Sequence, residues 1–194
     1  LQAAGVKLED IDLVFLTHMH PDHIGGLLEQ GRAALPKAEL WVDKIELGYW
    51  LYGPPAEEKE SLQVRLAKAY EGRINEFKPD QEIVPGLTAL KAYGHTPGHT
   101  VFRLVSKGQE ILFVGDIVHA AALQFPNPEE CASYDQDRSG AIEARKQILS
   151  LAAKGELLIA GAHIPYEGIG RVKEAGQGFS FTPNNYYNIE MEGF

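Results

Sequence analysis

Cysteine is almost absent from this chain of 194 residues, and Cys131 is the one example. An internal disulfide is therefore excluded, and Cys131 is interpreted as a free thiol in a loop. Basic residues are also few, with 18 Lys and Arg against 27 Asp and Glu and a formal net charge of −9. Nucleic acid is not expected as a partner, because binding to phosphates needs clustered Lys and Arg.

Long apolar runs are missing as well. No hydrophobic stretch approaches the ~18 residues that predict a membrane-spanning helix, so no membrane association is expected. Internal repeats, low-complexity tracts and linkers are not found. With 44% hydrophobic residues, the chain is predicted to form a single domain, 1–194, that is large enough for a real core.

The chain does contain a dense group of possible metal ligands at the end of a predicted strand. Residues 11–17 are rich in branched and aromatic side chains, and His18, His20, Asp22 and His23 follow directly. Side chains alternate in an extended segment, so His18 and His20 project to the same side and can bind one cation. After the intervening proline turns the backbone, Asp22 and His23 can face a second cation. A chance polar loop is disfavoured, because imidazole and carboxylate suit zinc and its divalent neighbours and have no packing role here.

Three more candidate ligands each lie at the end of a predicted strand. His99 is in the Gly-His-Thr-Pro-Gly-His loop at 94–99 and is expected to be the third ligand of the first cation, a plain turn histidine being the alternative. In the same loop, His95 is expected to orient or brace rather than to bind metal. Asp116 follows a fully buried strand and is expected to bridge the two cations, although it could instead cap a helix. His163 is expected to complete the second set.

The other elements are predicted from periodicity and turn residues. Strands are predicted at 39–43, 82–84, 87–93, 100–106, 110–114 and 157–161, and helices at 24–28, 44–52, 56–77 and 141–153. Residues 107–109 are a plausible hairpin connection. Asp137 or Ser139 is the candidate N-cap of the last helix, and the tail after 168 suits a short hairpin.

The spacing His-x-His-x-Asp-His, followed by His99, Asp116 and His163, resembles the metallo-β-lactamase superfamily. This resemblance implies an α+β fold, the αββα four-layer sandwich, with two divalent metal ions, preferentially zinc. Di-iron oxygen-reducing members have Glu where His20 stands, so a redox function is not expected. The implied metal ligands are His18, His20 and His99 for one ion, Asp22, His23 and His163 for the other, and Asp116 between them.

Several strands normally precede the first metal motif in that superfamily, whereas here the motif begins at residue 18. Leu1 is not an initiator methionine, and no signal or transit sequence comes before it. N-terminal strands are therefore expected to be missing from this chain. The compartment stays open for that reason; by resemblance, a secreted or periplasmic location and a homodimer are both compatible with the sequence.

The second half of the chain carries a narrower resemblance, to methyl parathion hydrolase and its lactone- and aryl-ester-hydrolysing relatives. The matching motifs are Gly-Asp-Ile-Val-His-Ala-Ala-Ala-Leu-Gln-Phe at 115–125, Ala-Arg-Lys at 144–146, Tyr-Glu-Gly-Ile-Gly-Arg-Val at 166–172 and Phe-Thr-Pro-Asn-Asn-Tyr at 181–186. The resemblance implies hydrolysis of ester-type bonds in a small molecule by a metal-bridging hydroxide. Asp22 and Asp116 are the expected catalytic carboxylates.

His119, Tyr134 and Trp50 are the expected substrate-pocket residues. His119 and Tyr134 stand where the organophosphate-cleaving members have leucine, and His119 could protonate a leaving oxygen as a catalytic residue. A lactone or aryl ester is therefore the preferred substrate class, an organophosphate triester is the alternative, and β-lactams and thioesters are less favoured. A purely structural role is the alternative for each of the three: His119 as a polar helix residue, Tyr134 as a loop aromatic and Trp50 as part of the core. A binding protein that has kept only the fold is disfavoured, since no ligand is missing.

Overall fold

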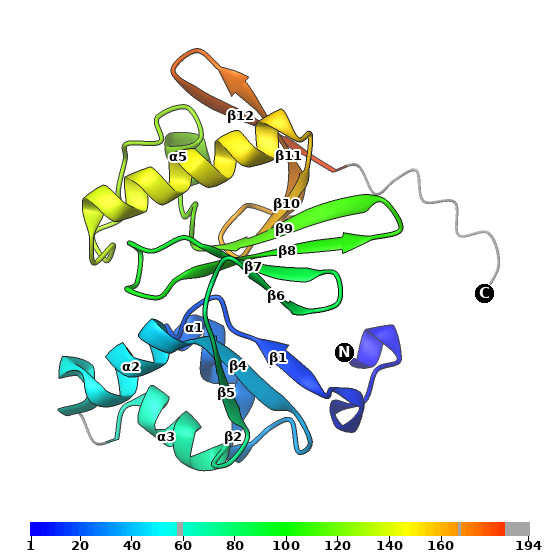
Figure 1. The fold of residues 1–194 in the computed structure, drawn as a ribbon, viewed down its shortest axis with the longest axis vertical. Helices are drawn as coiled ribbons and strands as arrows, with labels where there is room; N and C mark the ends of the chain where they lie inside the picture. The colour runs from blue at the N-terminus through cyan, green and yellow to red at the C-terminus, as the bar shows by residue number, and fades with distance from the viewer. Residues whose placement is uncertain (58–59, 167, 185–194) are drawn as a thin grey trace.

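The computed structural model describes residues 1–57, 60–166 and 168–184, and these form four layers in the order helix, sheet, sheet, helix (Figure 1). The smaller sheet is parallel, in the order β1-β4-β5. Its strands are β1 (Leu13–Phe15), β4 (Glu39–Asp43) and β5 (Ile74–Phe77). The expected αββα sandwich is confirmed.

The larger sheet has seven strands in the order β12-β11-β10-β9-β8-β7-β6, antiparallel except for the β9–β10 pair. Its strands are β6 (Gln81–Val84), β7 (Leu87–Lys91), β8 (Thr100–Ser106), β9 (Gln109–Gly115), β10 (Leu158–Gly161), β11 (Ile169–Ala175) and β12 (Gly178–Pro183). The expected C-terminal hairpin is formed by β11 and β12. The last two residues of the 181–186 motif, and residue 167 of the 166–172 motif, lie outside the described residues.

Helices lie on the outer faces of the two sheets and in the connections. They are α1 (Pro21–Ile24), α2 (Lys44–Tyr52), α3 (Leu62–Ala69), α4 (Ala121–Gln124) and α5 (Arg138–Lys154). Short 3₁₀ turns occupy Gln2–Ala4, Leu8–Asp10, Gly25–Leu27 and Pro54–Glu57, and a two-stranded ribbon is made by β2 (Leu28–Glu29) and β3 (Arg32–Ala33). Within the part of the chain that the structure describes, no helix is long and apolar enough to cross a bilayer.

The apolar core follows the alternation of side chains along the strands. Val101 of β8 faces outward into a cluster with Ile148 and Leu149 of α5, whereas its neighbour Phe102 faces the other sheet. Phe102 packs there with Phe77, at a ring-centroid distance of 5.8 Å. A third cluster fills the space between the smaller sheet and helices α2 and α3. Each layer boundary is therefore apolar, and the polar site residues are confined to the strand ends.

Several predicted elements are confirmed by the structure. The strand at 39–43, the helix at 44–52 and the strand at 100–106 have the predicted bounds. The Asp137 side chain caps α5 by accepting from the N–H of Gly140. Cys131 is a free thiol, as expected.

The single long helix predicted at 56–77 is wrong. Helix α3 ends at Ala69, Gly72 adopts φ +74°, and Ile74–Phe77 form strand β5 beside β4. Tyr70, the C-cap residue that follows Ala69, is fully buried, and its hydroxyl donates to the carbonyl of Leu27. Tertiary contacts therefore override a pattern that is also compatible with a continuous amphipathic helix. The predicted helix at 24–28 is likewise only a 3₁₀ turn that leads into β2.

Candidate metal centre

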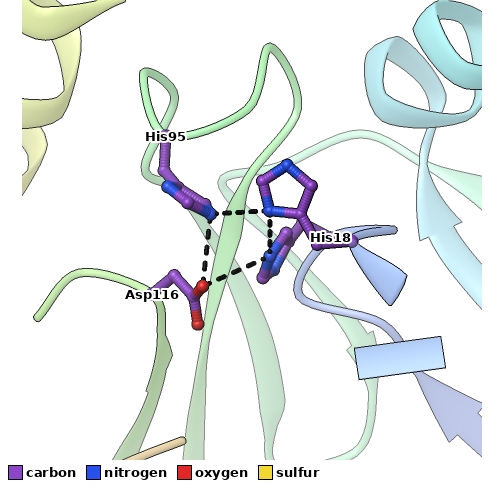
Figure 2. A group of neighbouring side chains, drawn as sticks. His18, His95 and Asp116 are labelled. Carbon is purple, nitrogen blue, oxygen red and sulfur yellow. Dashed lines mark hydrogen bonds and ion pairs between the residues drawn. The ribbon is translucent and has the colours of Figure 1, made fainter. Parts of the chain in front are cut away.

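The carboxyl ends of β1, β9 and β10 and the loop before β8 meet at one edge of the sandwich. A main-chain hydrogen bond of 2.8 Å from the N–H of Thr100 to the carbonyl of Thr17 joins the two sheets there. The first group of candidate ligands at this edge combines four side chains, each offering one ligand atom: His18, His20, His95 and Asp116. Figure 2 shows His18 and His95 turned toward the Asp116 carboxylate.

The spacing of these atoms suits a tetrahedral ion. His20 Nδ1 lies 3.1 Å from His18 Nε2 and 2.9 Å from His95 Nε2. Asp116 Oδ2 lies 3.2 Å from His95 Nε2 and 3.5 Å from His18 Nε2. Ligand atoms bound at 2.0–2.1 Å to tetrahedral zinc are about 3.3–3.4 Å apart. The four atoms therefore already have the mutual distances that a zinc ion needs.

A second group lies on the other side of Asp116 and contains Asp22, His23 and His163. His163 Nε2 is 3.3 Å from Asp22 Oδ2 and 3.3 Å from Asp116 Oδ2. His23 Nε2 is 3.0 Å from Asp116 Oδ1 and 3.5 Å from Asp22 Oδ2. Asp116 thus faces both groups, which is the arrangement that a carboxylate between two cations requires.

Unpaired buried atoms in this region also fit metal ligation. His23 Nε2 and Asp116 Oδ1 are buried and lie 3.0 Å apart, but neither makes a hydrogen bond of suitable angle with the other or with another described residue. Three imidazole nitrogens converge at His20 Nδ1, where at most one proton can be shared between any two of them. Such a cluster is costly in a buried place unless a cation lies among the lone pairs. The donor set therefore fits two divalent cations.

The protonation states agree with a metal site in most positions. Burial, and then the neighbouring His99, holds the pKa of His18 far below its usual range; burial and then His95 lower the pKa of His20 to about 4. Neutral imidazoles of this kind are the form that binds metal. Burial would raise the pKa of Asp116, but the neighbouring imidazoles of His119, His23 and His95 hold it well below the usual range.

His95 has the opposite tendency. Burial alone would lower its pKa, but its hydrogen bonds to Asp116 and Asp135 raise the pKa of His95 to about 9. A protonated His95 would donate from Nε2, the atom that it offers as a candidate ligand, to Asp116 Oδ2 at 3.2 Å. Metal binding would displace this proton.

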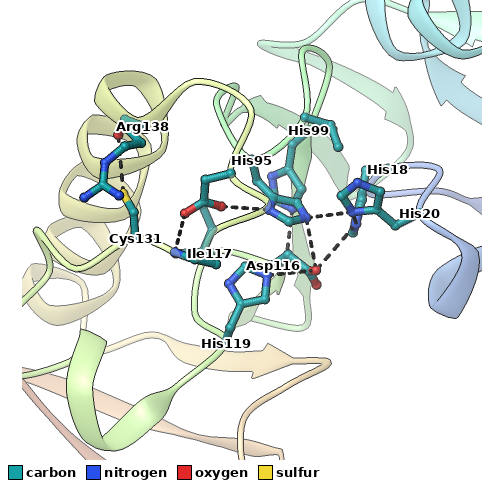
Figure 3. Close-up of polar contacts among 12 residues, drawn as sticks. His18, His20, His95, His99, Asp116, Ile117, His119, Cys131 and Arg138 are labelled. Carbon is teal, nitrogen blue, oxygen red and sulfur yellow. Dashed lines mark hydrogen bonds and ion pairs between the residues drawn. The ribbon is translucent and has the colours of Figure 1, made fainter. Parts of the chain in front are cut away.

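His99, the predicted third ligand of the first cation, belongs to none of the candidate ligand groups among the described residues. Its Nδ1 donates to the carbonyl of Ala92 at 3.2 Å, and its Nε2 accepts from the N–H of Asp116 at 3.0 Å. Both ring nitrogens of this fully buried residue are therefore engaged with the main chain. Gly115 allows this contact, because at φ +51° a Cβ there would lie 2.7 Å from His99 Nε2. His99 thus contacts the main chain of Asp116, whereas His95, which was predicted to brace the loop rather than to bind metal, belongs to the first group of candidate ligands (Figure 3).

Asp135 was missed by sequence reasoning. His95 Nδ1 donates to Asp135 Oδ1 at 2.9 Å, while Asp135 Oδ2 accepts from the N–H of Ala132 and lies 3.6 Å from Arg145. A carboxylate behind a metal-binding histidine fixes the ring and raises its basicity. Arg145 is itself buried and donates to the carbonyls of Ile117, Pro128 and Glu130. The Ala-Arg-Lys motif at 144–146 was the only sequence signal for this support.

The expected pocket residues His119 and Tyr134 lie together beside the second ligand group. A cavity of about 370 Å³ is lined by His20, Pro21, Asp22, Asp116, Tyr134 and His163. His119 Nε2 is 3.0 Å from Asp116 Oδ2, and its ring lies 5.3 Å from that of His163 and 4.9 Å from that of Tyr134. Among the described residues, its buried Nδ1 has no partner. Figure 3 shows His119 pointing at the Asp116 carboxylate.

Trp50 does not line this cavity. Its Nε1 donates to Glu46 Oε1 at 2.6 Å, and its ring contacts the edge of His20 at a centroid distance of 5.5 Å. The structure therefore places Trp50 behind a candidate ligand. Neither Trp50 nor His119 is among the residues that line this cavity, and their roles toward a substrate remain predictions.

Comparison with known proteins agrees with this geometry. The family model described as Metallo-beta-lactamase superfamily matches residues 1–163. A probable metallo-hydrolase of Mycobacterium tuberculosis is 27% identical over 188 residues, covering 85% of this chain and 58% of the relative. An N-acyl homoserine lactonase from a Bacillus species is 25% identical over 164 residues, covering 84% of this chain and 60% of the relative. The chain thus spans about 60% of the length of these curated relatives.

Two solved structures resemble the whole described fold. The dizinc quorum-quenching lactonase AidC, in complex with a product N-hexanoyl-L-homoserine, superimposes with a TM-score of 0.87 at 28% identity, covering 96% of this chain and 69% of AidC. The hydrolase AbOPH of the beta lactamase superfamily gives a TM-score of 0.85 at 33% identity, covering 95% and 68%.

Proposed function

This chain belongs to the metallo-beta-lactamase superfamily, and from that membership we propose that it is a metal-dependent hydrolase whose preferred substrates are lactones or aryl esters. The observation that carries the proposal is the position of Asp116, which lines the cavity, faces both ligand groups and lies 3.0 Å from His119 Nε2. Relatives named as N-acyl homoserine lactonases, and the product complex of AidC, support a lactone as the substrate.

Two divalent cations, preferentially zinc, are the proposed cofactors. They would be held by two groups of side chains that share Asp116: His18, His20 and His95, and Asp22, His23 and His163. When bound, such cations supply a hydroxide nucleophile near neutral pH and polarise the carbonyl under attack.

The residues around the cavity provide the remaining functions. Asp22 is exposed in the cavity and can accept a proton as the ester bond is attacked. His119 holds a proton between its Nε2 and Asp116, close to where a leaving oxygen would be released. Tyr134, with 54% of its side chain exposed, offers a ring face beside His119 for a flat acyl or aryl group.

An organophosphate triester is the alternative substrate class. It is favoured by the motif at 115–125, which resembles methyl parathion hydrolase, and the same cavity residues would face the phosphoryl group. His119 argues for the lactone or aryl ester, because an alkoxide leaving group gains most from a nearby proton donor. β-Lactams and thioesters are less favoured.

A rate comparison on the zinc-loaded protein tests this choice. Dihydrocoumarin, an acyl-homoserine lactone, a nitrophenyl ester and methyl parathion would be compared by kcat/KM, with the bound metal per chain measured on the same sample. We expect two divalent ions per chain and the highest kcat/KM on a lactone or aryl ester. A dominant triester rate would contradict the substrate class, and fewer than two ions in active protein would contradict the dinuclear centre.

A further inference from the structure

Glu46, in the first turn of α2, is a fully buried carboxylate close to the metal centre, with 0% of its surface exposed. Oε1 accepts from the N–H of Met19 at 2.9 Å and from Trp50 Nε1 at 2.6 Å. Oε2 accepts from Thr96 Oγ1 at 2.7 Å and from the N–H of Gly98 at 3.0 Å. Burial raises the pKa of Glu46, while these four donors favour the ionised form. A buried carboxylate is retained only where hydrogen bonds of this kind satisfy it.

Three of the four donors come from the two loops that form the first ligand group, and the fourth, Trp50, is in α2 itself. Met19 stands between His18 and His20, and Thr96 directly follows His95. Glu46 therefore connects the loop after β1 to the loop before β8, two segments that are far apart in the sequence. The same two segments also meet where His20 Nδ1 lies 2.9 Å from His95 Nε2 and where the N–H of Thr100 donates to the carbonyl of Thr17. Glu46 adds three hydrogen bonds from the loops to this junction.

Other buried contacts keep this connection rigid. The carbonyl of Met19 accepts from the buried Gln63 Nε2 at 2.8 Å, so both sides of the Met19 residue are held by side chains from α2 and α3. Gly98 is needed for the close approach, because a Cβ there would lie 2.3 Å from the backbone nitrogen of Glu46. Asp43 caps the start of α2 and accepts from the Tyr93 hydroxyl at 2.9 Å, which fixes the helix end that carries Glu46.

We infer that Glu46 is a positioning residue that sets the separation between the His18–His20 pair and His95, and thereby the affinity of the first cation site. Glu46 is not among the residues that line the cavity, so it is not assigned a role on the substrate. The inference deepens the proposed function and rests on it, because it concerns the same metal centre.

The test is the affinity of the metal-free protein for Zn²⁺ and Co²⁺, with Glu46→Gln as the variant. Gln has the same shape, but its amide nitrogen must face either the Met19 and Trp50 donors or the Thr96 and Gly98 donors. With either metal, we expect the affinity of one of the two cation sites to fall by about 10–100-fold. This is the typical effect of changing a residue that supports a metal ligand. The Co²⁺ absorption spectrum should change at the same time. Glu71→Gln, at an exposed position after α3, is the matched control and should leave both unchanged.

Thr96→Val and Thr96→Ser keep the inference testable if Glu46→Gln does not fold. Thr96→Val is nearly isosteric and removes one donor to Oε2, so a smaller fall in affinity at the same cation site is expected. Thr96→Ser retains the hydroxyl and should restore the affinity. This rescue separates positioning from a general loss of packing.

Unchanged affinity at both cation sites in a folded Glu46→Gln or Thr96→Val protein would overturn the inference. A lower melting temperature with an unchanged Co²⁺ spectrum would also overturn it. A wild-type protein that binds no divalent cation would overturn the proposed function together with the inference. Wild-type binding with unaffected variants would overturn the inference alone, so the two failures are distinguishable.

Discussion

At the scale of single residues, Asp116 is the side chain that lies close to both groups of candidate ligands and to His119. Its Oδ2 lies within 3.5 Å of nitrogen atoms from His18, His95, His119 and His163, and its Oδ1 lies 3.0 Å from His23. The carboxylate is itself held in place by its own backbone, since its N–H donates to His99. A change at Asp116 is therefore expected to affect both ligand groups.

Asp116→Asn should reduce the bound metal below two ions per chain and lower kcat/KM more than about 100-fold, because a neutral amide cannot balance two cations. Metal analysis and steady-state kinetics on the same preparation would measure this. Asp12→Asn, at an exposed position before β1, is the control and should retain both metal and activity. Two tightly bound ions in Asp116→Asn would show that the bridging assignment is wrong.

His119→Leu should reduce lactone hydrolysis more than hydrolysis of a nitrophenyl phosphotriester. A nitrophenolate leaves readily without a proton, whereas the alkoxide of an opened lactone does not, and general-acid help is typically worth ~10²–10⁴-fold. The ratio of the two kcat/KM values, variant over wild type, is the readout. Equal losses on both substrates would assign His119 to support of Asp116 rather than to the leaving group.

At the scale of elements, loops at strand ends decide which side chains reach the site. In the loop at 94–99, Gly94 adopts φ +138° and approaches the start of α5, where a Cβ would lie 2.0 Å from the backbone nitrogen of Ala141. This close approach holds the loop beside Asp135, so that His95 points at Asp116. Four residues later, His99 points back to the main chain.

The two histidines of this loop should therefore respond differently to the same substitution. His95→Asn is expected to lose one bound cation and most activity. His99→Asn is expected to retain two ions but to lose roughly 1–3 kcal/mol of stability, because a buried N–H of Asp116 is left without its acceptor. Metal content and urea unfolding would be measured for both variants. Loss of a cation in His99→Asn with retention in His95→Asn would reverse the ligand assignment.

At the scale of the whole molecule, the site lies where the two sheets meet. The ligand-bearing strand β1 belongs to the smaller sheet, and β8, β9 and β10 belong to the larger one. Buried neutral histidines at this junction connect the protonation of the site to the stability of the complete fold. Burial, followed by the charge of His95, lowers the pKa of the fully buried His99 to about 3.

The metal-free protein should consequently lose stability as the pH falls from 7 to 5. Unfolded histidine takes up a proton below about 6.5, while folded His99 stays neutral down to about 3, so the unfolded state binds more protons in this window. The contribution of His99 is about 2 kcal/mol at pH 5. His95, whose pKa is raised to about 9, contributes stability that is complete below 6.5 and is lost only as the pH rises toward 9. Urea unfolding at pH 7 and pH 5 would measure the difference, and a smaller pH dependence is expected in His99→Asn.

The candidate metal ligands were largely predictable from the sequence alone, because ligand type and spacing are local properties. His18 and His20 alternate on one extended segment, Asp22 and His23 follow within the same turn, and Asp116 and His163 directly end buried strands. The bounds of β4, α2 and β8 were also predictable, since strand and helix periodicities are read over a few neighbouring residues. The layer order was predicted only from the resemblance to the metallo-β-lactamase superfamily, not from these periodicities.

Only the tertiary structure decided which histidine of the loop at 94–99 faces the metal centre, and that Ile74–Phe77 is a strand. Both depend on partners distant in sequence: Asp135 for His95, and strand β4 for β5. The same holds for Glu46, whose carboxylate in a helical segment gave no local sign that it joins two ligand loops. Burial and long-range hydrogen bonds select among conformations that the local pattern permits equally, and these interactions exist only once the chain has folded.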